Sequence, residues 1–219
     1  MTHSTQDKVF FITFEGGEGC GKSTQIKRLV DYLTTSSSLK FIQTREPGGC
    51  PSAEILRDLI VKSQENEWQP FTELLLLLGS RIEHLKNIIQ PSLLNGIHVI
   101  CDRFSDSTYA YQGYARGMAI DLIHSLHQQL KIDIKPDRTY FLDIQPEIGL
   151  KRSKRRLEQS SSKEDRFEDL DLDFHHKIYK GFHKIIGQDP KRFCVVDASL
   201  SEDQVHAIII EDIKKTWGC

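Results

Sequence analysis

The sequence predicts an α/β protein in which helices cover both faces of a five-stranded parallel sheet. Three observations support this fold class. Short apolar, β-branched segments alternate with amphipathic, helix-like patterns along all 219 residues. These segments are almost uniformly apolar, which is typical of strands that are buried on both faces. The first of them leads through a glycine-rich turn into a helical pattern, as in other α/β proteins with a parallel sheet.

Each element follows from its local pattern, taken in chain order. We expect strands at 9–14, 40–44, 97–101, 139–144 and 193–196. We expect helices at 23–33, 53–61, 72–94, 146–156, 172–186 and 202–217, with a further pair within 107–130. In such a sheet, ligands bind at the carboxyl ends of the strands. The length suits a single domain that covers residues 1–219.

The charge balance and the cysteines limit the classes of partner and compartment. There are 29 basic and 31 acidic residues, which argues against a nucleic acid or an anionic membrane as the main partner. The five cysteines form no C-x-x-C pair and are typical of reduced thiols in an intracellular protein. Residues 1–8 are polar, unlike a secretion signal, and the longest apolar run, 74–78, is too short to span a bilayer. We therefore expect a cytoplasmic protein.

The glycine-rich turn carries a nucleotide-binding motif of the P-loop NTPases. Residues 16–23 fit G-x-x-x-x-G-K-[ST], with a predicted strand before them and a predicted helix after them. Backbone N–H groups of this motif surround a polyphosphate at the positive end of a helix. We expect Lys22 on the β- and γ-phosphates and Ser23 as a ligand of Mg²⁺. The residues predicted to bind ATP here are Gly16, Gly17, Glu18, Gly19, Cys20, Gly21, Lys22, Ser23 and Thr24. An ordinary glycine-rich turn is the alternative.

The helical pattern at 72–94 carries apolar residues over more than one face. Such a width predicts either a core helix within one molecule or a surface that pairs two molecules. The pattern alone leaves both interpretations open.

Charged residues follow two further strands and point to a second phosphate group. Arg45 precedes a stiff Glu-Pro-Gly-Gly turn, which would hold its guanidinium for a bidentate grip on an oxyanion. A salt bridge from Arg45 to Glu46 or Glu54 is the alternative. Asp102 ends the third strand, the usual place of a carboxylate that holds Mg²⁺. Arg103 beside it would meet phosphate oxygens.

Together these segments resemble the thymidylate kinases (dTMP kinases), a family of nucleoside monophosphate kinases. The stretch at 105–113 adds hydroxyl, amide and aromatic groups that suit a planar base and a sugar. The strings Asn-Lys-x-Asp and Asp-x-x-Gly of guanine-specific GTPases do not occur in the sequence. The motifs that carry the resemblance lie at 14–16, 44–49, 102–103, 110–113, 136–137, 142–143, 146–152, 165–168 and 196–199.

The resemblance implies a role for each matching residue. Arg45 would hold the dTMP phosphate, Glu18 would approach the sugar 3′-hydroxyl, and Arg81 would reach a thymine carbonyl. Arg103 would bridge the reacting phosphates, and Ser199 would lie in a turn beside adenine. The residues that would line the base and sugar are Thr108, Tyr111 and Gln112. Family members are homodimers, which favours a dimer surface on the 72–94 helix.

The resemblance also implies a mobile lid at about 151–166, in the arrangement of the bacterial enzymes. Residues 17–20, inside the phosphate loop, include no basic side chain, so the lid would supply the missing cation. The basic side chains of the first lid residues are Lys151, Arg152, Lys154, Arg155 and Arg156. We expect Arg152 and Arg156, four apart on one helix face, to be the working pair. A localisation tag, a nucleic-acid patch and a solvated helix face are the alternatives for this basic run.

The chain departs from the family at Leu77. The family commonly places a phenylalanine there, one helical turn before the arginine that reads the base. An aliphatic side chain would pack on the base instead, which leaves the strength of thymine selection open.

The acceptor expected here is a phosphate monoester, which needs no general base. The predicted catalytic residues are Lys22, Arg103, Arg152 and Arg156. Two rival functions remain. A deoxynucleoside kinase would need a carboxylate base for its hydroxyl acceptor, and a nucleotide-binding regulator would bind ATP without turnover.

Overall fold

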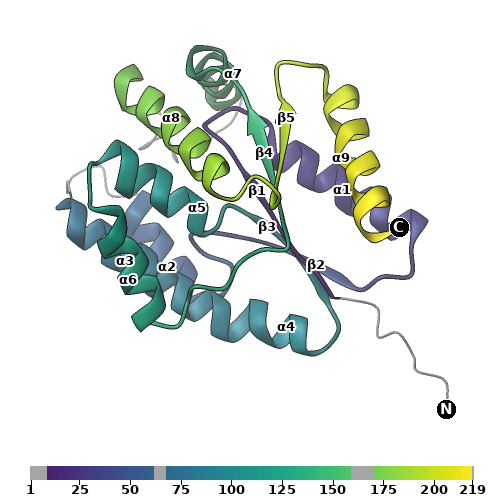
Figure 1. The fold of residues 1–219 in the computed structure, drawn as a ribbon, viewed down its shortest axis with the longest axis horizontal. Helices are drawn as coiled ribbons and strands as arrows, with labels where there is room; N and C mark the ends of the chain where they lie inside the picture. The colour runs from purple at the N-terminus through teal and green to yellow at the C-terminus, as the bar shows by residue number, and fades with distance from the viewer. Residues whose placement is uncertain (1–8, 62–67, 159–169, 219) are drawn as a thin grey trace.

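The structure is a computed structural model that describes residues 9–61, 68–158 and 170–218. Its centre is one parallel sheet with the strand order β2-β3-β1-β4-β5 (Figure 1). The strands are β1 (Phe11–Glu15), β2 (Phe41–Arg45), β3 (His98–Asp102), β4 (Arg138–Asp143) and β5 (Phe193–Asp197). The predicted five-stranded parallel sheet is therefore confirmed, and each strand lies close to its expected position.

Helices cover both faces of this sheet, as predicted. The helices α1 (Lys22–Ser36) and α9 (Glu202–Trp217) lie together on one face (Figure 1). The opposite face carries α3 (Pro70–His84), α6 (Ile120–Gln129) and α8 (Leu172–Gln188). The shorter or peripheral helices are α2 (Pro51–Val61), α4 (Gln90–Leu94), α5 (Ser105–Thr108) and α7 (Pro146–Glu158).

The central strand β1 contacts the helical layers on both faces of the sheet. Its side chains alternate between the two faces of the sheet. Ile12 and Phe14 pack with α1 and α9, whereas Phe11 packs with α3 and α6. All residues of β1 are buried, including the polar Thr13 and Glu15, as expected for a strand covered on both sides. The end of this strand is consequently a fixed point from which the phosphate loop starts.

The helical segment predicted at 72–94 is helical throughout but not uniformly α-helical. It consists of α3, a π-helical turn η1 (Leu85–Ile89) and α4. Pro91 gives a physical reason for the change, because it has no N–H and its ring meets the carbonyl four residues earlier in a regular α-helix. The pair predicted within 107–130 also includes a π-helical segment, η2 (Tyr109–Ala115), which is followed by α6.

The burial of residues 72–94 decides in part between the two interpretations of this helix, a core helix within one molecule and a surface that pairs two molecules. Leu74, Leu78, Leu85 and Ile89 are buried in the core of the monomer, whereas Leu75 is exposed. The core interpretation is thus correct for one face of the helix, and the opposite face stays available.

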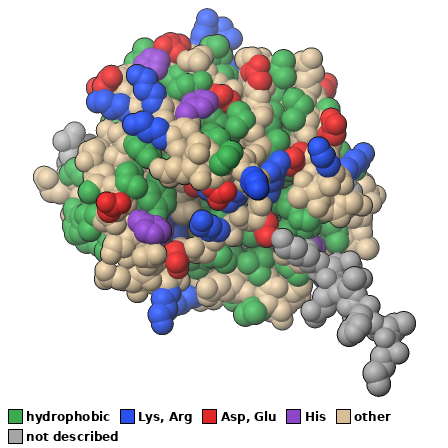
Figure 2. Space-filling model, viewed as in Figure 1, with side chains coloured by type: hydrophobic (Ala, Val, Ile, Leu, Met, Phe, Trp, Pro, Cys, Tyr) green, Lys and Arg blue, Asp and Glu red, His purple; other side chains and the backbone are tan. Residues whose placement is uncertain are grey.

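The surface carries charges of both signs. On the face shown in Figure 2, basic and acidic side chains are interspersed around a hollow near its centre. In the described part of the chain, no helix is both long enough and apolar enough to cross a membrane.

Candidate active site

The predicted site residues meet in one cavity of about 480 Å³ at the carboxyl ends of β1, β2 and β3. Parts of α1, α2, α3, α5, η2 and α7 complete its walls. Of the predicted residues, those that line it are Glu18, Gly19, Cys20, Gly21, Lys22, Ser23, Thr24, Arg45, Arg81, Asp102, Arg103, Thr108, Tyr111, Gln112 and Arg156. The predicted residues outside this lining are Gly16, Gly17, Arg152 and Ser199.

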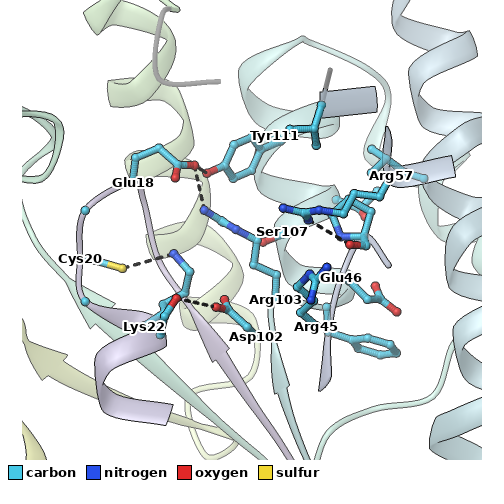
Figure 3. Close-up of a pocket in the computed structure, with 18 of the residues that line it drawn as sticks. Glu18, Cys20, Lys22, Arg45, Glu46, Arg57, Asp102, Arg103, Ser107 and Tyr111 are labelled. Atoms are coloured by element: carbon cyan, nitrogen blue, oxygen red, sulfur yellow. Dashed lines mark hydrogen bonds and ion pairs between the residues drawn. The ribbon is translucent and has the colours of Figure 1, made fainter. Parts of the chain in front are cut away.

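The phosphate loop curls around the side chain of Lys22. The Lys22 Nζ donates to the carbonyl oxygens of Gly16 and Gly17 at 3.2 and 3.1 Å, and lies 3.4 Å from Cys20 Sγ (Figure 3). Gly21 precedes α1 with φ 94°, a left-handed conformation that favours glycine. Among the described residues no side chain caps α1, and Gly21 to Thr24 at its start line the cavity, so its first N–H groups are available to an anion there.

The tip of the phosphate loop touches the start of helix α7, which carries the arginines predicted to belong to a lid. A Cβ atom on Gly19 would lie 1.9 Å from the Gly149 carbonyl oxygen, and one on Gly149 would lie 2.3 Å from the Glu18 carbonyl oxygen. Both positions therefore require glycine. This backbone contact fixes where α7 starts relative to the loop.

Two side chains with oxygen atoms that could bind a metal ion lie together at the bottom of the loop. The Ser23 hydroxyl donates to Asp102 Oδ2 at 3.3 Å, so the structure brings the two predicted metal residues together (Figure 3 labels Asp102). The other oxygen, Asp102 Oδ1, is buried and has no hydrogen-bond partner in the described part of the chain. A hydroxyl and an unsatisfied carboxylate oxygen beside a phosphate loop fit the hard, oxygen-seeking Mg²⁺ ion.

Glu18, Arg103 and Tyr111 form a hydrogen-bonded cluster on the other side of the cavity, in which Tyr111 is buried and the two charged side chains are partly buried. Glu18 Oε1 accepts from Arg103 Nη2 at 2.8 Å and from the Tyr111 hydroxyl at 2.7 Å (Figure 3). The Arg103 guanidinium also lies over the Tyr111 ring, 5.1 Å from its centroid. Burial alone raises the pKa of Glu18, but the charges of Arg103 and Lys22 outweigh it and lower that pKa to about 2. Glu18 is therefore a permanently charged hydrogen-bond acceptor at neutral pH.

Arg103 has an unusual backbone conformation, which Glu15 supports. Its φ of 65° is uncommon for a residue with a side chain, and its Nη1 donates to the Gly16 carbonyl at 3.0 Å. Glu15 Oε1 accepts from the next N–H, that of Phe104, at 2.8 Å, and Glu15 Oε2 accepts from the Ser107 hydroxyl at 2.6 Å. Burial and the nearby charge of Asp106 raise the pKa of Glu15 to about 7. The sequence analysis missed Glu15, because its partners are about ninety positions away along the chain.

Arg45 lies at the mouth of the cavity in an ion pair. Its Nη2 is 2.8 Å from Glu54 Oε2, so the salt bridge considered as an alternative is present in this structure. Half of the Arg45 side chain is exposed, and such pairs contribute little to stability. An incoming phosphate can therefore replace Glu54. Arg57 of α2 also lines the cavity and was not predicted, since no motif marks it within the helical pattern.

Deep in the cavity, Arg81 is buried against Glu46. The Arg81 Nε donates to Glu46 Oε2 at 2.7 Å, and both side chains are almost fully buried. Burial raises the pKa of Glu46, but the Arg81 charge and the His84 hydrogen bond lower it below its usual value. Leu77, one turn earlier on α3, lines the same cavity. The predicted base-reading arginine and the aliphatic residue near it are thus neighbours.

Gln112 is oriented by an acid that the sequence analysis missed. Its Nε2 donates to Glu73 Oε1 at 3.0 Å, and Arg116 binds the same carboxylate through two nitrogens at 2.8 and 2.9 Å. Gln112 and the neighbouring Thr108 are buried and line the cavity. Since the amide nitrogen is held by Glu73, the amide oxygen is left as an acceptor toward the cavity.

The two arginines expected to act as a pair at the lid have different surroundings. Arg156 lines the cavity, whereas Arg152 Nη1 donates to the Ala198 carbonyl at 2.7 Å. Ser199 follows in that turn and donates its N–H to Asp197 Oδ1 at 2.8 Å. Arg152 therefore contacts the turn expected beside adenine, whereas Arg156 lines the cavity that the phosphate loop borders. Lid residues 159–166 lie outside the described residues.

Comparisons with known proteins agree with this geometry. A family model described as thymidylate kinase matches residues 14–209. A thymidylate kinase of Magnetococcus marinus is 43% identical over 204 residues, which are 93% of this chain and 95% of the relative. One of Caulobacter vibrioides is 41% identical over 209 residues, covering 95% of this chain and 98% of the relative. The crystal structure of thymidylate kinase from Ehrlichia chaffeensis matches with a TM-score of 0.74 and 34% identity, covering 94% and 98% of the two chains. The chain therefore belongs to the thymidylate kinase family.

Proposed function

We propose that the cavity holds ATP and dTMP together for the family's reaction, the ATP-dependent phosphorylation of dTMP to dTDP. One observation carries this proposal. A single cavity joins a phosphate loop on one side to a buried, polar pocket on the other, with Arg103 between them. Two phosphate groups can therefore meet beside one cation, which is the arrangement that phosphoryl transfer requires.

On the donor side, the phosphate loop binds the ATP phosphates. Its N–H groups and Lys22 hold the β- and γ-phosphates, and Ser23 and Asp102 hold Mg²⁺. The ion, when bound, neutralises charge on the phosphate oxygens. Arg152 and Ser199 serve the adenine end, outside the cavity lining.

On the acceptor side, Arg45 and Arg103 hold the dTMP phosphate, and Glu18 accepts from the sugar hydroxyl beside Tyr111. The residues that contact the base are Arg81, Thr108 and Gln112. Donors from Arg81 and an acceptor from Gln112 complement the carbonyl and N–H groups of a thymine edge.

The residues supply charge rather than a base. The acceptor phosphate is largely dianionic at neutral pH, since its second pKa is about 6. Lys22, Arg103 and Arg156 stabilise the charge that spreads over the transferring group. A deoxynucleoside kinase would need a carboxylate base, and Glu18, with a pKa of about 2, is a poor one.

We also propose that the protein is a homodimer in the cytoplasm, formed of single-domain chains that bind neither nucleic acid nor membrane. Exposed apolar side chains on α2 and α3 support the dimer; these are Ile55, Leu59, Phe71 and Leu75. Four free cysteines among the described residues support a reducing compartment. Light scattering tests the dimer, which Leu75→Asp is expected to weaken.

Incubation with ATP, Mg²⁺ and either dTMP or thymidine tests the function. We expect ADP and dTDP from dTMP and no transfer to thymidine. Transfer to thymidine would support a deoxynucleoside kinase, and binding of ATP without any product would support a regulator.

A further inference from the structure

The guanidinium of Arg81 is held along two of its edges. Its Nε donates to Glu46 Oε2 at 2.7 Å, and its Nη1 lies 2.8 Å from Nε2 of His127, a residue of α6. The third nitrogen, Nη2, hydrogen-bonds to no side chain or carbonyl among the described residues, and Arg81 lines the cavity. Because a guanidinium is planar, fixing two nitrogens determines where the third one points.

His127 can accept this hydrogen bond in only one tautomer. Its Nδ1 lies 2.7 Å from the Ile123 carbonyl oxygen, which can only accept, so Nδ1 carries the hydrogen. In the neutral ring, Nε2 is then an acceptor and receives the Nη1–H of Arg81. Burial and the Arg81 charge lower the pKa of His127 to about 4, so the ring is neutral at physiological pH. The ring also stacks on Tyr109, with 5.3 Å between centroids.

We propose that His127 is a positioning residue for base selection, which acts through Arg81 and does not touch the substrate. The proposal rests on the proposed function, in which Arg81 donates to a carbonyl of thymine. With Glu46 and His127 in place, Arg81 presents Nη2–H donors to the carbonyl at C4. A base with an amino group at C4 offers a donor there instead, and two donors cannot pair. Leu77 packs through an aliphatic side chain, and Gln112 faces the N3 position, so discrimination at C4 depends on how Arg81 is oriented.

Two variants separate the acceptor from the ring. His127→Phe keeps a ring that can stack on Tyr109 but removes the acceptor for Arg81. His127→Gln removes the ring but places an amide oxygen near the position of Nε2. If His127 only fills space, His127→Phe should be the milder change. If it positions Arg81, His127→Gln should be the milder one.

The experiment compares dTMP with 5-methyl-dCMP, which keeps the methyl group, sugar and phosphate but has an amino group at C4 and no hydrogen on N3. The N3 difference faces Gln112 and is the same for every His127 variant, so a change in preference reports on Arg81. Calorimetry gives the affinity for each nucleotide, and steady-state kinetics give kcat and both KM values. For His127→Phe we expect the KM for dTMP to rise about tenfold, the loss typical of a hydrogen bond to a charged group. The preference for dTMP over 5-methyl-dCMP should fall by a similar factor, while kcat and the KM for ATP change by less than about twofold.

His127→Gln should keep that preference within about threefold of the wild type. An unchanged preference in His127→Phe, or an equal loss in both variants, would overturn the proposal. Thermal unfolding shows whether each variant is folded, and His127→Leu replaces His127→Phe if the latter is not. A wild-type protein that does not phosphorylate dTMP would remove the proposed function and this inference together. An active wild type with an unchanged preference in His127→Phe would remove only the role of His127.

Discussion

The two sides of the cavity hold their charges in different ways. On the side proposed to bind the acceptor, here the acceptor side, Arg81 is paired with Glu46 and Arg103 with Glu18, and these side chains are largely buried. On the side proposed to bind ATP, here the donor side, Lys22 contacts backbone carbonyls, and Asp102 Oδ1 has no hydrogen-bond partner in the described part of the chain. The acceptor side is therefore organised before any ligand binds, whereas the donor side has charges that a nucleotide and its metal would satisfy.

This difference has an energetic reason. A buried ion pair holds its two side chains in a fixed geometry, and the protein loses much stability when one partner is removed. Such a site suits the selection of a base and a sugar, where orientation decides the outcome. A transferring phosphate instead needs cations that act most strongly in the transition state. The following changes test this division, from the largest expected effect on activity to the smallest.

Arg156→Ala should give the largest effect. Arg156 lines the cavity beside the phosphate loop, and cations of this kind contribute on the order of 10³-fold or more to phosphoryl transfer. Both kcat and kcat/KM should fall, because the interaction acts in the transition state. Arg152→Ala is the matched control on the same helix. It removes the bond to the Ala198 carbonyl and should lower kcat by less than about tenfold. Equal losses of kcat in the two variants would contradict the different roles that we infer from the positions of these arginines.

Lys22→Ala should lower kcat by about 10²–10³-fold, the usual loss for one preorganised donor. Lys22 lies within the phosphate loop, on the side of the cavity proposed to bind the donor phosphates. Steady-state kinetics with varied ATP and dTMP check this, and the KM for dTMP should hardly change. A rise in the KM for dTMP as large as the fall in kcat would count against separate donor and acceptor sides.

Arg45→Ala should raise the KM for dTMP by about ten- to a hundredfold, with little effect on the KM for ATP, because one charged contact is lost. Glu54→Gln is the control. This substitution removes the negative charge that pairs with Arg45. It keeps an oxygen that can accept the hydrogen bond which the Gly49 N–H donates to Glu54 Oε1 at 2.8 Å. We expect the KM for dTMP to stay within about twofold in Glu54→Gln. A large rise there would show that the salt bridge, rather than phosphate binding, explains Arg45.

Glu15→Gln should have the smallest effect on activity and a clear effect on the pH dependence of stability. The pKa of Glu15 is raised from 4.5 to about 7, so the folded protein binds a proton that the unfolded chain has released. The stabilisation is complete below pH 4.5 and is lost as the pH rises through about 7, by at most about 3 kcal/mol. Glutamine does not titrate, so urea unfolding at about pH 5 and pH 8 should show a smaller difference in the variant. The same difference in both proteins would refute the raised pKa.

The sequence predicted the parts of the molecule that depend on local patterns. The strands, the phosphate loop at 16–23 and the charged residues Arg45, Asp102 and Arg103 follow from short motifs at strand ends. Parallel strands bring those ends together, so the meeting of these residues was also predictable.

The buried partners were not predictable, because they come from distant parts of the chain. Glu46 and His127 meet Arg81 across 35 and 46 positions, and Glu73 meets Gln112 across 39. Glu46 belongs to the motif at 44–49, but that motif does not indicate its partner, and His127 and Glu73 belong to no motif. A spacing of four predicts that two arginines share a helix face, but the elements packed beside the helix decide what each one contacts, here the Ala198 carbonyl for Arg152 and the cavity for Arg156. The sequence could therefore identify Arg152 and Arg156 without separating their roles.

Calorimetric titration with dTMP, in the absence of ATP and Mg²⁺, tests the division of the cavity most directly. The acceptor side is already organised, so wild type and Lys22→Ala should bind dTMP with dissociation constants that agree within about twofold. Arg45→Ala should bind it at least about tenfold more weakly. If Lys22→Ala lost dTMP binding to the same extent as Arg45→Ala, the two sides would not be independent and the account would be wrong.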